Sequence, residues 1–195
     1  MIGIIQRVLL DLLEETGGEP LKFAVMDRAG VPHDRDFRID QNYPDDECLK
    51  LIQGAVDETG LSEDAINVLY AKAFLKEARN LFPQFFMMAK SSEQFLLRQA
   101  TIHGVIASGL KKPEERQVVK DKFSARSIEP GFVEVTYRSP NKLCGLFRAL
   151  AHEVAGIYGE CLTVHCADCM KRGDDACRFE LRWEKTAPDG ILSSE

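Results

Sequence analysis

The sequence lacks several features that would assign it to a large class of proteins. Its 195 residues contain no long apolar run, because Asp11, Glu14 and Glu15 interrupt the first apolar segment. A membrane span needs about 20 consecutive apolar residues, and a secretory signal needs a basic start that this segment does not have. We therefore expect a cytoplasmic protein with no membrane partner.

Positive charge and catalytic signatures are also scarce. The chain has 25 Lys and Arg against 31 Asp and Glu, a net charge of −6, and no basic run is interleaved with aromatic residues. Nucleic-acid binding needs a concentrated positive surface, so we expect no such partner. No nucleophile and base, glycine-rich phosphate loop or carboxylate pair stands at a recognisable spacing, which predicts that the protein is not an enzyme.

Cysteine is what the sequence does have. Of the six cysteines, three lie with His165 in the segment HCADCMKRGDDACRFE, residues 165–180. In a cytoplasmic chain such cysteines more often bind metal, take part in redox chemistry or are buried than form a disulfide framework. Cys166 and Cys169 have the spacing of a zinc-ligand pair. A zinc site, a reversible disulfide and plain buried thiols all remain open at this point.

The first part of the chain shows helical periodicity. Apolar residues recur at spacings of three and four up to Gly17 and Gly18, and Ser91 with Gln94 has the form of a capping box. Further helices are expected over residues 20–29, 45–58, 62–79, a stretch opened by Pro83, and 91–110.

The period changes to two after residue 112. We expect strands over 118–126, 132–139, 161–166 and 176–183, with a helix over 141–158. The pattern predicts an α+β fold: one domain over residues 1–185, with a helical subdomain (1–110), an α/β subdomain with an antiparallel sheet (111–185), and a flexible tail (186–195).

Two groups of residues could hold a cofactor between these subdomains. His103 lies on the apolar stripe of the 91–110 helix, where a histidine is more often a core residue than a ligand. Its neighbour Gly104 costs about 1 kcal/mol relative to alanine in a helix and favours the approach of something flat. Tyr137, Ser139 and Asn141 project to one side at spacing two and suit a carboxylate, although they also read as a strand end before an Asn cap.

With these residues the chain resembles the haem nitric oxide/oxygen binding (H-NOX) family. The start MIGII, the stretch LFPQFF, the histidine in the long helix and the Y-x-S element follow the family's order over nearly the whole chain. The resemblance implies haem b between the two subdomains, with His103 as axial ligand. It also implies that Tyr137 and Ser139 bind the propionates and that Pro113 presses on the haem.

The chain departs from the family pattern at one propionate position. Where the family has arginine, this chain has Asn141, which offers neutral donors in place of a planar charged fork. We therefore expect weaker propionate binding at Asn141.

The resemblance also indicates which gas is bound. Leu146 stands where oxygen-binding members have a tyrosine that donates a hydrogen bond. Other apolar residues are expected over the same face of the haem: Ile5, Leu9, Ala78 and Leu150. Without a donor, nitric oxide, and also CO, should bind in preference to oxygen.

Some members of the family resemble this chain in the cysteine segment as well. The resemblance implies a zinc site formed by Cys144, His165, Cys169 and Cys177, with Cys166 as a substitute ligand. Zinc-bound thiolates remain oxidisable, so such a site could add a redox input.

These features predict a haem-based sensor of nitric oxide that signals to a separate protein. The family implies a histidine kinase or a cyclic-dinucleotide enzyme as partner, with weakening of the bond between iron and His103 as the signal. The cysteine segment also resembles the vinyl-reductase-related domains, so a haem-free module that binds a small molecule or metal is the alternative.

Overall fold

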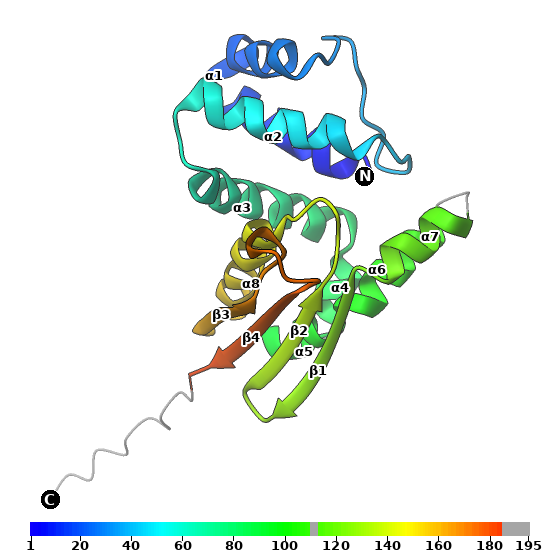
Figure 1. Cartoon of the computed structure of the whole chain (residues 1–195), viewed down its shortest axis with the longest axis vertical. Helices are drawn as coiled ribbons and strands as arrows, with labels where there is room; N and C mark the ends of the chain where they lie inside the picture. The colour runs from blue at the N-terminus through cyan, green and yellow to red at the C-terminus, as the bar shows by residue number, and fades with distance from the viewer. Residues whose placement is uncertain (110–112, 185–195) are drawn as a thin grey trace, which may run out of the picture.

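The computed structural model describes residues 1–109 and 113–184, which form a helical N-terminal half and a C-terminal half built on a sheet (Figure 1). The tail predicted for residues 186–195 lies outside the described residues. Within the described ranges, no helix combines the length and apolar character of a membrane span.

Six helices precede residue 110. α1 spans Ile4–Ala29 and bends at Gly18, where a φ of 71° favours glycine, so the predicted interruption is confirmed. The other helices are α2 (Asp45–Thr59), α3 (Glu63–Leu81), α4 (Pro83–Met87), α5 (Ser92–Leu97) and α6 (Gln99–Ser108).

The prediction of one helix over 91–110 was wrong. The helix breaks at Arg98, whose φ of −92° and ψ of 7° separate α5 from α6. Arg98 donates a hydrogen bond to the carbonyl of Met88 at 3.1 Å, so a contact outside the helix accompanies the break. The predicted N-cap is confirmed, because the Ser91 hydroxyl accepts from the Gln94 N–H at 3.2 Å.

The C-terminal half forms a four-stranded antiparallel sheet of order β1-β2-β4-β3. Its elements are α7 (Pro113–Lys120), β1 (Phe123–Glu129), β2 (Phe132–Tyr137), α8 (Cys144–Ile157), β3 (Leu162–Asp168), a 3-10 helix (Met170–Arg172) and β4 (Cys177–Trp183). The strand predicted from residue 118 was wrong in its first part. Pro113 takes the first helical position, where its fixed φ favours a helix, and the strand begins only at Phe123.

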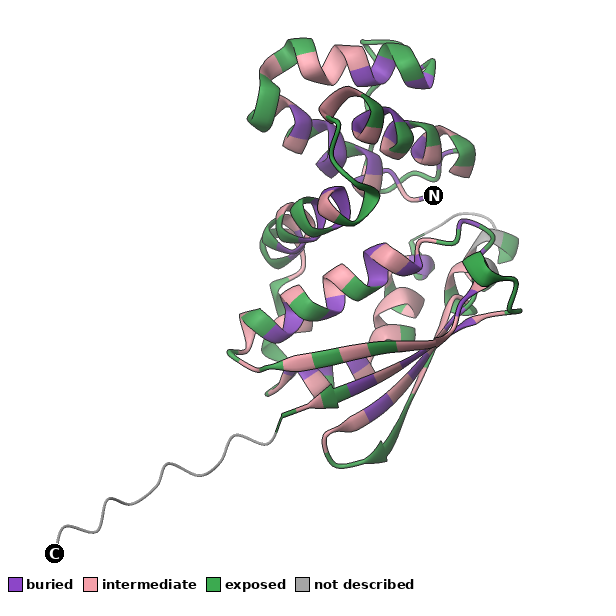
Figure 2. Cartoon of the chain, turned by 60° about the vertical axis from the view of Figure 1, so that its left-hand side comes forward, coloured by how far each residue is buried: buried purple, intermediate pink, exposed green. Residues whose placement is uncertain are grey.

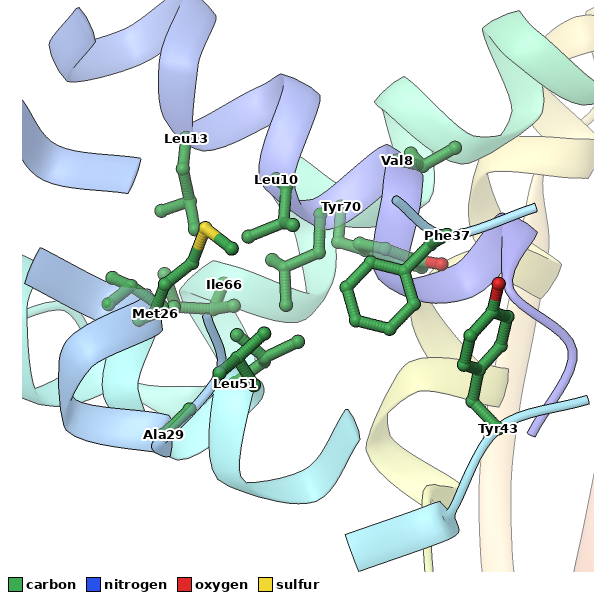
Figure 3. Packing of buried hydrophobic residues seen from close by; sticks show 14 of the residues in the cluster. Val8, Leu10, Leu13, Met26, Ala29, Phe37, Tyr43, Leu51, Ile66 and Tyr70 are labelled. Carbon is green, nitrogen blue, oxygen red and sulfur yellow. The ribbon is translucent and has the colours of Figure 1, made fainter. Parts of the chain in front are cut away.

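Two apolar cores support these halves. In the first, α1, α2 and α3 pack together around Leu51 and Met26, which are fully buried (Figure 3). In the second, α8 covers the face of the sheet that carries Val135 and Phe179, and β2 and most of β4 alternate between buried and half-buried residues (Figure 2). Burying each such side chain contributes about 1.5–3 kcal/mol. Leu146 of α8 belongs to the first core, so α8 joins the two halves.

Candidate functional site

His103 is held in an orientation that suits a metal ligand. It lies on α6, and its Nδ1 is 2.8 Å from the carbonyl oxygen of Gln99. That carbonyl can only accept, so the proton sits on Nδ1 and the lone pair of Nε2 stays free. Burial lowers the pKa of His103, which keeps the imidazole neutral. A Cβ added to Gly104 would meet nothing within 4 Å, so the helix backbone is open on that side.

Aromatic rings connect His103 to the predicted propionate residues. The His103 and Phe123 ring centroids are 4.6 Å apart, and Phe123 lies 5.0 Å from Tyr137. Phe123 and Tyr137 are register partners on β1 and β2, so the sheet fixes their contact. The Phe123 ring therefore occupies the space between His103 on α6 and Tyr137 on the sheet.

The structure brings Tyr137, Ser139 and Asn141 together in buried positions, but their polar groups are already paired. The Tyr137 hydroxyl accepts from the Leu143 N–H at 3.3 Å, and the Ser139 hydroxyl accepts from the Asn141 N–H at 3.4 Å. Burial raises the pKa of Tyr137, so its phenol stays neutral.

Asn141 is tied to the helical half of the protein. Its Nδ2 donates to the Asp45 carboxylate at 2.6 Å. Burial would raise the pKa of Asp45, but hydrogen bonds from the Met1 ammonium and from Asn141 outweigh it and lower that pKa. Lys122 acts electrostatically on both Asp45 and His103. At the predicted propionate end, Asn141 therefore offers a neutral amide that is already bound to a carboxylate of α2.

A small cavity of about 10 Å³ lies among α1, α2, α3 and α8. Three of the predicted distal residues line it: Ile5, Leu9 and Leu146. Ala78 and Leu150 do not line it and instead lie within the apolar packing. Typical pockets for small molecules measure about 300–1,000 Å³, so this cavity is far smaller than such a pocket.

The same cavity has two polar residues that the sequence analysis did not place there. Tyr70 donates its hydroxyl proton to the Ile5 carbonyl at 3.1 Å, whereas the Nδ2 of Asn67 is buried without a partner in the described structure. A carbon added at Gly145 would lie 2.8 Å from that Nδ2. The burial of Asn67 has a signal in the sequence, because Asn67 precedes Tyr70 and Ala71 by three and four residues, and all three are buried on α3.

Three cysteines form a second candidate site. The sulfur atoms of Cys144, Cys169 and Cys177 all lie within 4.8 Å of one another, and Cys144 and Cys169 are 3.7 Å apart. Ligands at about 2.3 Å from a tetrahedral zinc ion lie about 3.8 Å from each other, so this spacing fits a metal and is far too long for a disulfide. The cluster could therefore hold a metal ion.

A short loop positions two of these cysteines. Gly173 has a φ of 103°, and the Asp174 carboxylate accepts from the Cys169 N–H at 2.7 Å. The Cys177 sulfur accepts from the Met170 N–H at 3.2 Å. Burial would raise the pKa of Cys169, but backbone N–H groups from Lys171 and Arg172 outweigh it and lower that pKa.

The structure separates His165 from the three cysteines. His165 is exposed on β3, with its Nδ1 3.8 Å from a carboxylate oxygen of Glu180. Cys166 is half-buried, and its Sγ donates to the Asp168 carbonyl at 3.1 Å. Burial and the neighbouring Cys169 raise the pKa of Cys166 to about 11, so of the two residues Cys166 is the one whose side chain interacts with a cysteine of the cluster.

Pro113 and the remaining cysteines stand outside both sites. Pro113 is exposed at the start of α7. Cys48 is fully buried in the wall of the small cavity, and Cys161 is exposed; neither forms a disulfide. Burial raises the pKa of Cys48 to about 12, so its thiol is inert.

Comparisons with known proteins agree with this architecture. A family model described as Haem-NO-binding matches residues 2–166. The fold is similar to an H-NOX protein from S. oneidensis in the Fe(II)NO state, with a TM-score of 0.77 and 16% identity over 94% of this chain and 99% of that one.

Two further solved structures are similar. An Fe(II) unliganded H-NOX mutant, A71G, from K. algicida has a TM-score of 0.78 and 17% identity over 95% of this chain and 98% of that one. An oxygen-binding H-NOX domain related to soluble guanylate cyclases has a TM-score of 0.75 and 16% identity, with both chains fully covered. No curated protein matches the sequence.

Proposed function

Because the chain belongs to the haem-NO-binding family of haem-based gas sensors, we propose that it binds haem b through His103 and senses nitric oxide. The observation that carries this proposal is the bond between the His103 Nδ1 and the Gln99 carbonyl, which leaves Nε2 free. A neutral imidazole with one free nitrogen, set among apolar and aromatic side chains, is the donor that ferrous haem takes as an axial ligand.

The propionate end uses weaker donors than the family pattern. Tyr137 and Ser139 offer neutral hydroxyls. The Asn141 amide donates to the Asp45 carboxylate, so this hydrogen bond has to break or be shared before the amide can bind a propionate. Lys122 supplies the positive charge in this region, since its ammonium acts on both Asp45 and His103. Pro113, which the family pattern gives the role of pressing on the haem, is exposed at the start of α7 and is not part of the proposed site.

The gas preference follows from the cavity beside Leu146. Ile5, Leu9 and Leu146 offer no hydrogen bond, and the Tyr70 hydroxyl is used by the Ile5 carbonyl. Asn67 has the one unpartnered donor that lines this cavity in the described structure. Oxygen depends on a strong donor, while nitric oxide and CO do not, so nitric oxide is the gas we propose.

The signal leaves the protein through α6. Haem, when bound, would supply an iron atom that takes up the gas, and His103 on α6 would hold that iron. A weaker hold of the iron on His103 would free α6, which packs against β1 and α7. A helix with two positions is the kind of element that a ligand can bias. The receiver is a separate signalling protein, such as a histidine kinase or a cyclic-dinucleotide enzyme.

The cysteine cluster is a zinc site in this proposal. Cys144, Cys169 and Cys177 supply three sulfurs, and Cys166 supplies the fourth ligand in preference to His165, which is exposed. The ion ties the start of α8 to the loop before β4. Oxidation of the thiolates would eject the metal and add a redox input.

Gas exposure tests the proposed function. The haem-loaded ferrous protein should change its absorption spectrum on addition of nitric oxide and keep the unliganded spectrum in air during the first minutes. A stable oxygen-bound spectrum in air would overturn the gas preference, and a spectrum insensitive to both gases would overturn the sensor function. Myoglobin, which binds both gases, serves as the positive control.

A further inference from the structure

A groove of about 430 Å³ lies where α3, α4 and α8 meet, and it is not part of the haem or cysteine sites. Its volume falls within the range of about 300–1,000 Å³ that is typical of binding pockets. Neither His103 nor any cysteine lines it. The groove therefore needs a separate explanation.

One wall of the groove concentrates positive charge. Lys72, Lys76 and Arg79 follow one another on α3 at spacings of four and three, which places them on one face of the helix. In the described parts of the chain, no carboxylate lies within ion-pair distance of these three side chains. The whole chain carries a net charge of −6, so the wall is a local reversal of sign.

The floor of the groove is apolar and exposed. Met87 is 83% exposed, and Phe86 and Pro83 continue the floor along α4. The adjacent Met88 is 60% exposed. Exposed methionines adapt to different partners, and an apolar patch with a charged rim is typical of an interaction surface.

The floor is attached to both helices that border the haem site. The Tyr158 hydroxyl, at the end of α8, donates to the Phe86 carbonyl at 2.9 Å. Arg98, the residue that begins α6, donates to the Met88 carbonyl at 3.1 Å. A displacement of α6 would therefore be transmitted through Arg98 to Met88, next to the floor of the groove.

We propose that this basic groove, formed by Lys72, Lys76, Arg79, Phe86 and Met87, docks an acidic segment of the signalling partner. The segment would place carboxylates on the α3 wall and a large apolar side chain on the α4 floor. This inference rests on the proposed function, because a gas sensor that signals to a separate protein needs a surface that binds that protein.

The shape and charge favour a protein segment over other anionic partners. The groove is concave and short, whereas a membrane presents a flat surface and a nucleic-acid duplex needs a long row of cations. Glu153 on the α8 wall would repel a continuous row of phosphates, but a peptide can place a neutral or basic residue opposite it. Complementary charge would speed association and set specificity.

Fluorescence anisotropy with a designed peptide tests the docking site. The probe is a labelled 14-residue helical peptide with glutamates at spacings of four and three and leucines on the adjacent face. The triple variant Lys72→Glu, Lys76→Glu, Arg79→Glu should bind it at least tenfold more weakly than the wild type, and added salt should weaken wild-type binding.

A matched control separates the groove from net charge. The variant Lys50→Glu, Lys120→Glu, Lys142→Glu alters three exposed lysines outside the groove by the same total charge and should stay within twofold of the wild type. Equal loss in both variants would overturn the proposal. So would absence of peptide binding by the wild type, or binding of phosphatidylserine vesicles or duplex DNA in preference to the peptide.

A second arm tests the link to the gas. In the haem-loaded protein, nitric oxide should change the affinity for the peptide at least threefold, and Arg98→Met should remove that change while peptide binding remains. An unchanged affinity on gas addition in the wild type would overturn the link through Arg98. A protein that binds the peptide in the groove but takes up no haem would instead reject the proposed function and leave the docking site standing.

Discussion

The His103 site lies on α6 in the helical half and the cysteine cluster lies in the C-terminal half, and the two sites differ in how complete they are. The three sulfurs already stand at metal-ligand spacing, with Cys144 and Cys169 3.7 Å apart. At the other site, His103 is oriented for iron, yet Phe123 packs against it and the distal cavity measures about 10 Å³. The sulfurs stand at ligand spacing, whereas an aromatic ring packs directly against His103.

The difference has a physical origin. Cys169 and Cys177 are eight residues apart, and hydrogen bonds within their own loop fix their positions. The haem site joins α6, β2 and the distal helices, whose polar groups satisfy one another, as Asn141 does with Asp45. Buried polar groups are hydrogen-bonded in folded proteins, and here the partners come from elements far apart in the sequence.

The largest effect should come from His103→Gly, because no other side chain offers a free imidazole nitrogen at that place. Haem content after purification should fall at least tenfold and should recover when imidazole is supplied. The measurement is haem per chain from absorption, with circular dichroism to establish that the variant is folded.

His152→Ala is the matched control, since His152 is an exposed histidine on α8. It should retain haem at the level of the wild type. If His103→Gly kept full haem content without imidazole, the assignment of His103 as the iron ligand would be wrong. The comparison of the His103 site with the cysteine cluster would then have no basis.

Cys169→Ser should have the next largest effect, because the Cys169 sulfur interacts with the sulfur atoms of both Cys144 and Cys177. We expect zinc affinity to fall by a factor of about 100 or more and the melting temperature to drop, since metal binding contributes to folding. Elemental analysis and thermal melts provide the readouts. Cys161→Ser, an exposed cysteine, should change neither.

The same assay decides the fourth ligand. Cys166→Ser should lower zinc affinity and His165→Ala should not, because His165 is exposed and lies against Glu180. The reverse result would restore His165 as the ligand. Reduced wild-type protein that takes up no zinc would remove the metal site altogether.

Asn141→Arg should have a moderate effect in the opposite direction. Arginine can pair with Asp45 and still offer charged donors to a propionate, so haem affinity should rise up to about tenfold, or about 1.4 kcal/mol. Competition for haem with apomyoglobin gives the affinity. Weaker binding in the variant would mean that the bond between Asn141 and Asp45 supports the site as it is.

The smallest effect should come from Asn67→Leu. The Asn67 amide is buried without a partner, so its replacement should be neutral or stabilising by about 1 kcal/mol, seen as a small rise in melting temperature. Nitric oxide binding should be unchanged. A marked loss of gas binding would show that Asn67 acts on the ligand.

Much of the fold could be predicted from the sequence, because it depends on periodicity. The alternation of Val133, Val135 and Tyr137 correctly predicted β2. The break at Arg98 could not be predicted, since it coincides with a tertiary contact to Met88. The predicted start of the first strand at residue 118 was wrong, because residues 113–120 form α7 and the alternating pattern does not indicate that helix.

The candidate sites divide in the same way. Spacing along the chain identified three cysteines that the fold brings together, but it could not distinguish His165 from Cys166, since adjacent residues on a strand face opposite sides. Of the residues that the resemblance implied over one face of the haem, Ile5, Leu9 and Leu146 line one cavity. Ala78 and Leu150 do not line it. The pairing of Asn141 with Asp45 joins residues far apart in sequence and has no local signal.

A titration of the wild-type protein with haem tests the central claim most directly. The Soret absorbance should rise to a sharp endpoint at one haem per chain, and the ferrous form should show a spectrum typical of a single histidine ligand. Absence of an endpoint, with only the broad absorption of free haem, would contradict the account.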